Sequence, residues 1–562
     1  MTSAAVKLAL PLHEEQVRAP RRLPLLPVAA LLDAQRSLTA VERFSELHDE
    51  GQLPSSERVY RSRIPLERPK INQQYAFEVD LDACTGCKAC VSGCHTLNGL
   101  DDTEAWRTVG FLHGGTTAAP ALQTVTTSCH HCLEPACLSG CPVKAYEKDP
   151  VTGIVKHLDD QCIGCQYCTL MCPYDAPKFN KARGIVRKCD MCSSRLDKAE
   201  EPACVQACPN GAIAIRTVEK SAVVESSQGN GFLPGAPAAE HTLPSTIYKT
   251  KKAMAPNMLP ADFYHSSPEH SHPPLVIMLT LTQLSVGAFA LTFTVERFFG
   301  QRPGGPLAQT VFACTLAVIA LAASVFHLGR PWLAWRVFLG LRTSWLSREA
   351  IAFGVFAKLG VLYGVLTLAT QLRRFPGKEI ALAAAPSVQA AAAFMGILGV
   401  FFSVMVYVAT RRLYWSGLQT GFKFFATMTL LGASSVLFVH AATRGTVGAL
   451  AHGLLSLVMV VAVAKLGFES RVFAELRNRR HSAGKRVALL LTGDLASYAK
   501  ARYGFGILGG VLLPLVARTG LAPLALATVC GLSLLALTAG ELLERYLFFR
   551  AAPASRMPGG LQ

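Results

Sequence analysis

The chain has 562 residues, 51% of them hydrophobic, and a formal charge of +17, and it is too long for a single hydrophobic core. Sixteen of its 18 cysteines precede residue 210 in tight C-x2-C repeats. We expect no signal peptide, and therefore a reducing compartment, in which this spacing excludes a disulfide framework and indicates metal or cluster ligands. Basic residues flank the apolar runs, so the positive charge favours a lipid bilayer over nucleic acid as partner.

Residues 1–74 form an N-terminal extension without a cysteine motif. Apolar residues recur every third position between Leu38 and Leu47, and Thr39 and Glu42 have the spacing of a capping box. We therefore expect a short amphipathic helix. The sequence leaves open whether this helix packs on its own domain or docks to a partner subunit, and we assign partner docking to the extension.

Residues 75–215 contain four groups of four cysteines. The groups are Cys84, Cys87, Cys90 and Cys94; Cys129, Cys132, Cys137 and Cys141; Cys162, Cys165, Cys168 and Cys172; and Cys189, Cys192, Cys204 and Cys208. Three close thiolates can surround three irons of a cube, and Gly86 and Gly164 let the backbone fold tightly around it. We therefore expect four 4Fe-4S clusters, with these sixteen cysteines as the iron ligands, rather than zinc sites or a redox sensor.

The runs DACTGCKACVSGCHTLNGLDD, SCHHCLEPACLSGCP, CIGCQYCTLMCPYDAPKFN and RKCDMCSSRLDKAEEPACVQACP resemble the iron–sulfur (B) subunit of the dimethyl sulfoxide reductase family. The resemblance implies two nested ferredoxin-like units in which the fourth cysteine of each group ligates the neighbouring cluster. It also implies that the outer pair, formed by the first and last groups, supplies both ends of the cluster chain. The implied ligand sets are Cys84, Cys87, Cys90 and Cys208; Cys94, Cys189, Cys192 and Cys204; Cys129, Cys132, Cys137 and Cys172; and Cys141, Cys162, Cys165 and Cys168.

Residues 216–273 are rich in Pro, Ser, Gly and His and show no sustained periodicity. This composition predicts a long linker that carries the chain from the cluster domain to the membrane surface. The linker can lie along a partner as an extended strap.

Residues 274–550 contain eight apolar stretches, each long enough to span a bilayer, before a tail over 551–562. The expected spans are 275–296, 307–328, 351–372, 386–410, 423–442, 446–468, 503–517 and 522–543. Cys314 and Cys530 fall inside them and are expected to be ordinary buried residues. The predicted fold class is an α+β ferredoxin-like multi-cluster domain followed by an all-α eight-helix transmembrane bundle.

The loops on the side of the two termini carry eighteen Lys and Arg residues, against seven on the other side. By the positive-inside rule this asymmetry places the cluster domain in the cytoplasm, on a multi-pass protein of the inner membrane. The basic loops could instead form a docking surface for the cluster domain, and the sequence leaves that alternative open.

The runs SVFHLGRPWLAW, SWLSREA and LALTAGELLERYLFF resemble the membrane anchor (C) subunit of the same family, so the chain resembles a B–C fusion. In that family a His and a Glu at these positions serve quinol oxidation, which implies catalytic roles for His327 and Glu349. A base beside the ring must accept the protons that quinol releases. The alternatives are a structural histidine and a surface ion pair of Glu349 with Arg348. Arg330 can orient a quinone oxygen or simply mark the interface.

Other polar residues in the apolar half allow further hypotheses. His440 and His452 suggest haem b, but the anchors that this chain resembles carry none, so we do not expect haem. Glu541 is expected to form a helix–helix hydrogen bond rather than a proton relay. Lys358 is the clear candidate for a charged residue in mid-membrane.

The sequence as a whole predicts an electron-transfer and anchor subunit that exchanges electrons between the quinone pool and a separate molybdopterin-containing catalytic subunit. The substrate-converting site is expected on that partner, and the direction of electron flow stays open. A cytoplasmic cluster domain favours nitrate, sulfite or another oxyanion as the substrate. The alternatives are a redox-driven ion pump, which needs charges in mid-membrane, and a redox sensor, which needs an output domain that no segment offers.

Overall fold

The computed structural model describes Asp33, Glu42 and residues 62–65, 67–228, 232–264, 267–300, 303–372, 376–445, 448–553 and 557–558. The chain divides into two compact units, residues 1–62 and residues 63–562. Apart from Glu42, the amphipathic helix predicted between Leu38 and Leu47 lies outside the described residues, so it stays a prediction.

The first sheet joins the two ends of the cysteine-rich sequence. Strand β1 (Gln73–Asp80) pairs antiparallel with β8 (Ile213–Glu219) and parallel with β9 (Ile247–Lys249). In the antiparallel register Val79 lies opposite Ile213. Because β1 ends just before the first cysteine group and β8 begins just after the last, this pairing brings those two groups to the same end of the sheet.

The remaining strands form one further sheet and two short hairpins. The second sheet has the order β10-β2-β3, and all its pairs are antiparallel. The bounds of these strands are β2 (Thr108–Gly115), β3 (Pro120–Thr127), β4 (Tyr146–Lys148), β5 (Val155–His157), β6 (Lys178–Asn180), β7 (Ile185–Arg187) and β10 (Leu259–Pro260). Strand β4 pairs with β5, and β6 pairs with β7.

Each cysteine group leads into a short helix. These helices are α4 (Ala89–Asn98), α5 (Ala136–Gly140), α6 (Tyr167–Met171), α7 (Ser193–Leu196) and α8 (Ala203–Gln206). The loops before α4 and α6 turn through left-handed backbone at Gly86 (φ 74°) and Gly164 (φ 69°). This conformation costs least for glycine, as the sequence predicted for both positions.

Residues 216–273 contain more structure than the predicted linker. They complete β8 and contribute α9 (Lys220–Gln228), the 3₁₀ turn η1 (Ala239–His241), β9 and β10. Strand β9 pairs with β1, and β10 pairs with β2, so both pack onto the cluster domain. Such short strands carry no periodicity of their own, which is why composition alone indicated a linker.

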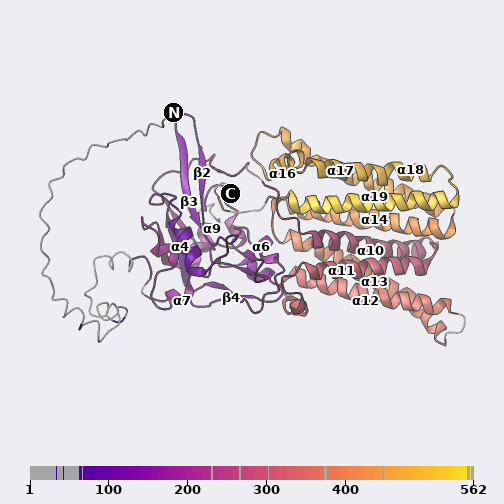
Figure 1. The fold of residues 1–562 in the computed structure, drawn as a ribbon, viewed down its shortest axis with the longest axis horizontal. Coiled ribbons are helices and arrows are strands. Elements are labelled where there is room, and N and C mark those ends of the chain that lie inside the picture. The colour runs from indigo at the N-terminus through magenta and orange to yellow at the C-terminus, as the bar shows by residue number, and fades with distance from the viewer. Residues whose placement is uncertain are drawn as a thin grey trace, which may run out of the picture. The chain divides into compact units, whose positions relative to one another are not determined.

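Eight helices in the described part of the chain are long and apolar enough to span a membrane, which confirms the predicted number. They lie side by side in Figure 1. Their bounds are α10 (Pro273–Phe298), α11 (Pro306–Phe326), α12 (Trp345–Gln371), α13 (Lys378–Val408), α14 (Gly417–Arg444), α15 (Ala449–Ser470), α17 (Ala496–Ile507) with the π turn η5 (Leu508–Leu512) and α18 (Leu513–Ala517), and α19 (Pro523–Arg550). The connecting loops hold η2 (Pro331–Gly340), η3 (Leu413–Trp415), η4 (Arg471–Arg477) and α16 (Ala483–Thr492).

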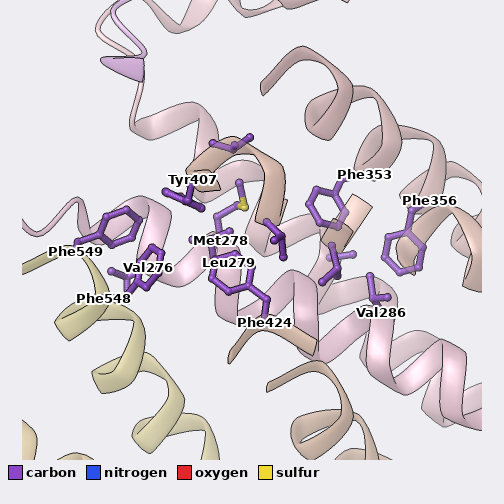
Figure 2. Packing of buried hydrophobic residues seen from close by; sticks show 14 of the residues in the cluster. Val276, Met278, Leu279, Val286, Phe353, Phe356, Tyr407, Phe424, Phe548 and Phe549 are labelled. Carbon is purple, nitrogen blue, oxygen red and sulfur yellow. The ribbon is translucent and has the colours of Figure 1, made fainter. Parts of the chain in front are cut away.

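Helices α10 and α14 are the most buried members of the bundle, each 72% buried over its apolar window. They approach so closely at Gly287 and Gly432 that a Cβ on Gly287 would lie 2.0 Å from the Met428 carbonyl oxygen. Beside this crossing, aromatic side chains of α10, α12, α13, α14 and α19 belong to one cluster, with Tyr407, Phe548 and Phe549 at one end and Phe353 at the other (Figure 2). Of the two isolated cysteines, Cys530 is buried, whereas Cys314 is only half-buried.

The cluster domain docks on the helix bundle through backbone contacts between glycines. The loop after α11 donates the Gly329 N–H to the Gly164 carbonyl oxygen at 3.4 Å and the Arg330 N–H to the Ile163 carbonyl oxygen at 3.0 Å. A Cβ on Gly329 would lie 2.1 Å from the Gly184 carbonyl oxygen, so no side chain fits there. The Tyr167 hydroxyl of α6 adds a hydrogen bond of 2.8 Å to the Val406 carbonyl oxygen, and Figure 1 shows α6 next to the helix ends.

Gly329→Ala should weaken this docking, because its methyl group must displace the backbone of Gly184. We expect a loss of about 1–3 kcal/mol in the free energy of unfolding, measured by thermal unfolding in detergent micelles followed by circular dichroism. Gly453→Ala is the matched control, since a Cβ at Gly453 meets no atom within 4 Å. Equal stability of the two variants would show that the glycine contact does not hold the domain.

Candidate functional site

The packing of the short helices pairs the cysteine groups two by two. Helix α4 packs on α8, where a Cβ on Gly93 would lie 2.7 Å from the Ala207 Cβ. Helix α5 packs on α6, where a Cβ on Gly140 would lie 2.7 Å from the Met171 Cγ. The first group therefore lies beside the fourth, and the second lies beside the third, which is the nesting that the family resemblance implies.

Two small cavities show the crossed sets of cysteines directly. One is lined by Cys129, Cys132 and Cys137 of the second group together with Cys172 of the third. The other is lined by three cysteines of the last group and one of the first: Cys94, Cys189, Cys192 and Cys204. In both, the fourth cysteine of one group faces three cysteines of its partner group.

The other two sets are also crossed. Cys84 lies within electrostatic range of Cys87, Cys90 and Cys208. Cys168 lies within range of Cys141, Cys162 and Cys165. Each of the four sets thus brings together four thiols from two cysteine groups, which is the number of ligands that an iron–sulfur cube requires.

Two buried cations lie among these thiols, and sequence reasoning missed both. The Lys188 side chain donates to the Val155 carbonyl oxygen and, at 2.8 Å, to the Cys189 carbonyl oxygen. The Arg107 guanidinium donates to Ser128 at 2.9 Å and is only 2% exposed. A cluster held by four thiolates would be negatively charged, and these cations would offset part of its charge inside the fold. The position of Lys188 directly before Cys189 was the available signal.

The four cysteine sets differ in their access to solvent. Cys87 is exposed, and Cys84 and Cys208 of the same set are half-buried. In the set of Cys141, Cys162, Cys165 and Cys168, only Cys165 is not fully buried, and it faces the membrane helices. The expectation that the outer pair supplies both ends of the cluster chain is therefore wrong at the membrane end, where the third group docks on the loop after α11.

A cavity of about 290 Å³ lies where the cluster domain meets the bundle. It is near the lower limit of the volumes typical of small-molecule pockets, about 300 Å³. Most of its lining is apolar and comes from α10, α11, α12, α13 and the loop helix η2. The cluster domain contributes α6 and Cys165, so the cavity wall contains an expected iron ligand.

His327 and Glu349 both line this cavity, although 22 positions separate them in the sequence. His327 caps the C-terminus of α11, and Glu349 lies in the second turn of α12. The Glu349 carboxylate is 3% exposed and accepts a short hydrogen bond from the Ser403 hydroxyl. The fold thus brings both predicted residues to one apolar cavity, and adds Ser403 and Tyr407, which sequence reasoning did not single out.

Burial lowers the pKa of His327 to about 4, because an apolar environment disfavours the charged imidazolium. The ring is therefore neutral near pH 7, and one of its nitrogens can accept a hydrogen bond.

Arg330, which the sequence offered as a possible contact of a quinone oxygen, contacts the cluster domain instead. Its Nη1 donates to the Asp159 carbonyl oxygen at 2.8 Å, so it joins the loop to the cluster domain.

The other polar residues singled out in the apolar half lie apart from this cavity. His440 accepts a hydrogen bond of 3.1 Å from the Gly304 N–H, and His452 is exposed. Lys358 is exposed on α12 and does not point into the bundle interior. None of these three lines the cavity that contains His327.

A buried charge cluster lies in the C-terminal half of the bundle. Its members are Lys423, Lys465, Glu469, Arg502, Glu541, Glu544 and Arg545, all with side chains at most 10% exposed. Glu541 is its centre, since it accepts hydrogen bonds from Thr427 at 2.6 Å, Lys465 at 2.8 Å and Arg502 at 2.9 Å. The helix–helix hydrogen bond predicted for Glu541 is confirmed, and the charge cluster joins α14, α15, α17 and α19.

Two protein families match different parts of the sequence. The 4Fe-4S dicluster domain matches residues 121–218. The family of the DMSO reductase anchor subunit (DmsC) matches residues 269–550, about half of the full length.

Several curated relatives of the cysteine-rich half are iron–sulfur subunits. The B subunit of anaerobic dimethyl sulfoxide reductase from Haemophilus influenzae is 32% identical over 189 residues, which cover 32% of this chain and 91% of that one. The corresponding B subunit of Escherichia coli K12 is 33% identical over 187 residues, covering 31% and 88%. The formate dehydrogenase-O iron-sulfur subunit of the same organism is 29% identical over 282 residues, covering 45% and 83%.

Glu541→Leu should destabilise the bundle strongly, because it leaves Lys465 and Arg502 buried with one carboxylate fewer. Breaking a buried ion pair costs about 3–5 kcal/mol, and the loss is measurable by thermal unfolding in detergent micelles. Glu379→Leu, at an exposed carboxylate in the first turn of α13, is the control and should cost no more than about 1 kcal/mol. If both variants lose the same stability, the charge cluster does not hold the helices together.

Proposed function

This protein belongs to the dimethyl sulfoxide reductase family, with an iron–sulfur B subunit and a DmsC-type membrane anchor in one polypeptide, and from this premise we propose that it exchanges electrons between quinol and a separate catalytic subunit. The partner that we propose contains molybdopterin and converts the substrate. The chain itself provides the quinol site, the cluster ligands and the anchor.

The observation that carries this proposal is the cavity shared by His327, Glu349 and Cys165. It is apolar, as the ring of a quinol requires, and it contains few polar groups that can orient the hydroxyls. An expected iron ligand lies in its wall. A quinol in this cavity would therefore be in contact with the ligand shell of the nearest cluster.

Quinol oxidation releases two electrons and two protons, and we assign the first contacts with both hydroxyls to the chain's own residues. The neutral His327 imidazole accepts a hydrogen bond from one hydroxyl. The Glu349 carboxylate, held in place by Ser403, accepts a proton at the other. The Glu349 carboxylate has little contact with bulk water, because this residue is only 3% exposed.

The sixteen cysteines would hold four 4Fe-4S clusters, which supply one-electron transfer when bound. The set with Cys165 lies at the cavity, and the set with the exposed Cys87 lies at the protein surface. We propose that the surface around Cys87 is where the catalytic subunit exchanges electrons. The N-terminal extension, residues 1–74, is proposed to dock to the same partner.

We propose that the cluster domain faces the cytoplasm. The basic loops lie on its side of the bundle, since Arg336 donates to the Asp160 carbonyl oxygen at 2.6 Å and Arg550 to that of Glu269 at 2.8 Å. The same contacts support the alternative that these loops serve docking, so both explanations of the charge asymmetry apply together. A cytoplasmic catalytic subunit favours an oxyanion such as nitrate or sulfite as the substrate.

The alternative of a redox-driven ion pump has less support. It needs charged groups along a path through the membrane, but Lys358 is exposed on the outside of the bundle. The buried charge cluster pairs its charges internally. We therefore prefer electron transfer without ion transport.

Replacement of the cavity residues tests the quinol site. In the anaerobically prepared full chain, His327→Ala and Glu349→Gln should each slow the reduction of the clusters by quinol by about a hundredfold, the typical size of a general-base contribution. Stopped-flow absorbance measures the rate, and dithionite reduction should be unchanged. His452→Ala, at an exposed histidine of α15, is the control. An unchanged rate of cluster reduction in both cavity variants would show that His327 and Glu349 do not take part in quinol oxidation.

Iron analysis tests the cluster number. Four clusters require about sixteen irons per chain, and a content near eight, or zinc in place of iron, contradicts the proposal. Cys141→Ser distinguishes crossed from local ligation. With crossed ligation, it damages the cluster held with Cys165, so that quinol no longer reduces the remaining clusters while dithionite does. Cys530→Ser should leave the iron content unchanged, because Cys530 is buried in the bundle away from the cysteine sets.

A further inference from the structure

A second pair of histidines lies beside the proposed quinol site, at the point where the chain enters the membrane. His272 caps the N-terminus of α10, and its side chain lines the cavity. His270 precedes it by two residues and is exposed. The ring centroids of His272 and His327 are 5.1 Å apart, and those of His270 and His272 are 4.6 Å apart. The rings therefore form a continuous series from the cavity to the surface.

We propose that His272 and His270 form the exit path through which the protons released by quinol oxidation leave the cavity for water on the cluster-domain side. This inference rests on the proposed quinol oxidation and names the residues that its protons pass. For each quinol oxidised, two protons leave the two hydroxyls, two electrons go to the clusters, and the quinone remains.

The chemistry of imidazole suits such a path. A neutral ring accepts a proton at one nitrogen and donates one from the other, so it can pass a proton on without keeping it. His272 is 7% exposed, and among the described residues its Nδ1 has no hydrogen-bond partner. Its backbone N–H donates to His270 Nδ1 at 3.3 Å, which keeps the exposed ring next to the buried one. The buried ring thus has a nitrogen available to a quinol hydroxyl or a cavity water.

The charges around the two rings disfavour a proton that stays on either ring. His272 lies beside His327, His270 and Arg412, and burial followed by these neighbours lowers its pKa to about 3. His270 lies beside Lys181 and Arg550, and burial followed by these cations lowers its pKa. The neighbouring acid is Glu269, which interacts with Arg412. Burial and these cations therefore disfavour a resident imidazolium, so neither ring retains a proton.

The backbone decides which variant tests the path without damaging the fold. His272 has φ 45°, a left-handed conformation. Asparagine adopts this conformation more readily than most residues, so His272→Asn removes the imidazole while keeping the helix start. His270→Ala removes the exposed ring. His113→Ala, at an exposed histidine of β2, is the matched control.

The experiment uses the full chain with its clusters in lipid nanodiscs, mixed with decylubiquinol or menadiol under stopped flow. His272→Asn should slow cluster reduction by about tenfold or more, since a lost proton-transfer group typically costs at least that much. Added imidazole should restore the rate, and binding of a quinone analogue should be unchanged. His270→Ala should make the rate depend on buffer concentration, and His113→Ala should behave as the unaltered protein.

An unchanged rate of cluster reduction in His272→Asn overturns the exit path. A slow rate also overturns it if quinone binding is lost and imidazole does not restore the rate, because His272 would then position the quinone rather than pass protons. Failure of the underlying quinol proposal gives a different result. In that case the unaltered protein is reduced by dithionite but not by either quinol.

Discussion

The close contact of three glycine backbones, Gly164, Gly184 and Gly329, is the constraint on which the arrangement of this protein depends. Two of them adopt left-handed backbone, with φ 69° and 65°, and the third has no space for a Cβ. This contact involves only main-chain atoms, and it fixes the loop of the third cysteine group against the end of α11. The same loop carries Cys165, and His327 directly follows the last residue of α11. The distance between Cys165, an expected iron ligand, and the cavity is thus set by main-chain atoms.

Charge burial shapes the rest of the molecule in two different ways. In the cluster domain, Lys188 and Arg107 lie among thiols, where a bound cluster would supply the compensating negative charge. In the bundle, the charges compensate each other around Glu541. Both solutions avoid an isolated charge in an apolar interior, which would cost several kcal/mol. The first depends on a cofactor and the second does not, so we expect the bundle to fold without iron more readily than the cluster domain.

Much of the site was predictable because the relevant signals are local. The spacing of the cysteine groups, the glycines at 86 and 164 and the eight apolar runs are all readable within short windows of sequence. The resemblance then named His327 and Glu349, and both line one cavity. The expectations that failed concern relations between segments. The outer pair does not supply the membrane end of the cluster chain, and residues 216–273 add strands to both sheets.

The sequence by itself determined the kinds of chemistry present, namely cysteine ligands for clusters, apolar spans and a histidine and a glutamate near span ends, since each depends on residue type and spacing. Only the tertiary structure decided which cysteines meet, which cluster set faces the membrane, and that His272 joins His327 at the cavity. It also decided that seven charges scattered from Lys423 to Arg545 form one buried cluster. The physical reason is that helix packing and strand register bring distant residues together, and neither is encoded in any short window of the sequence.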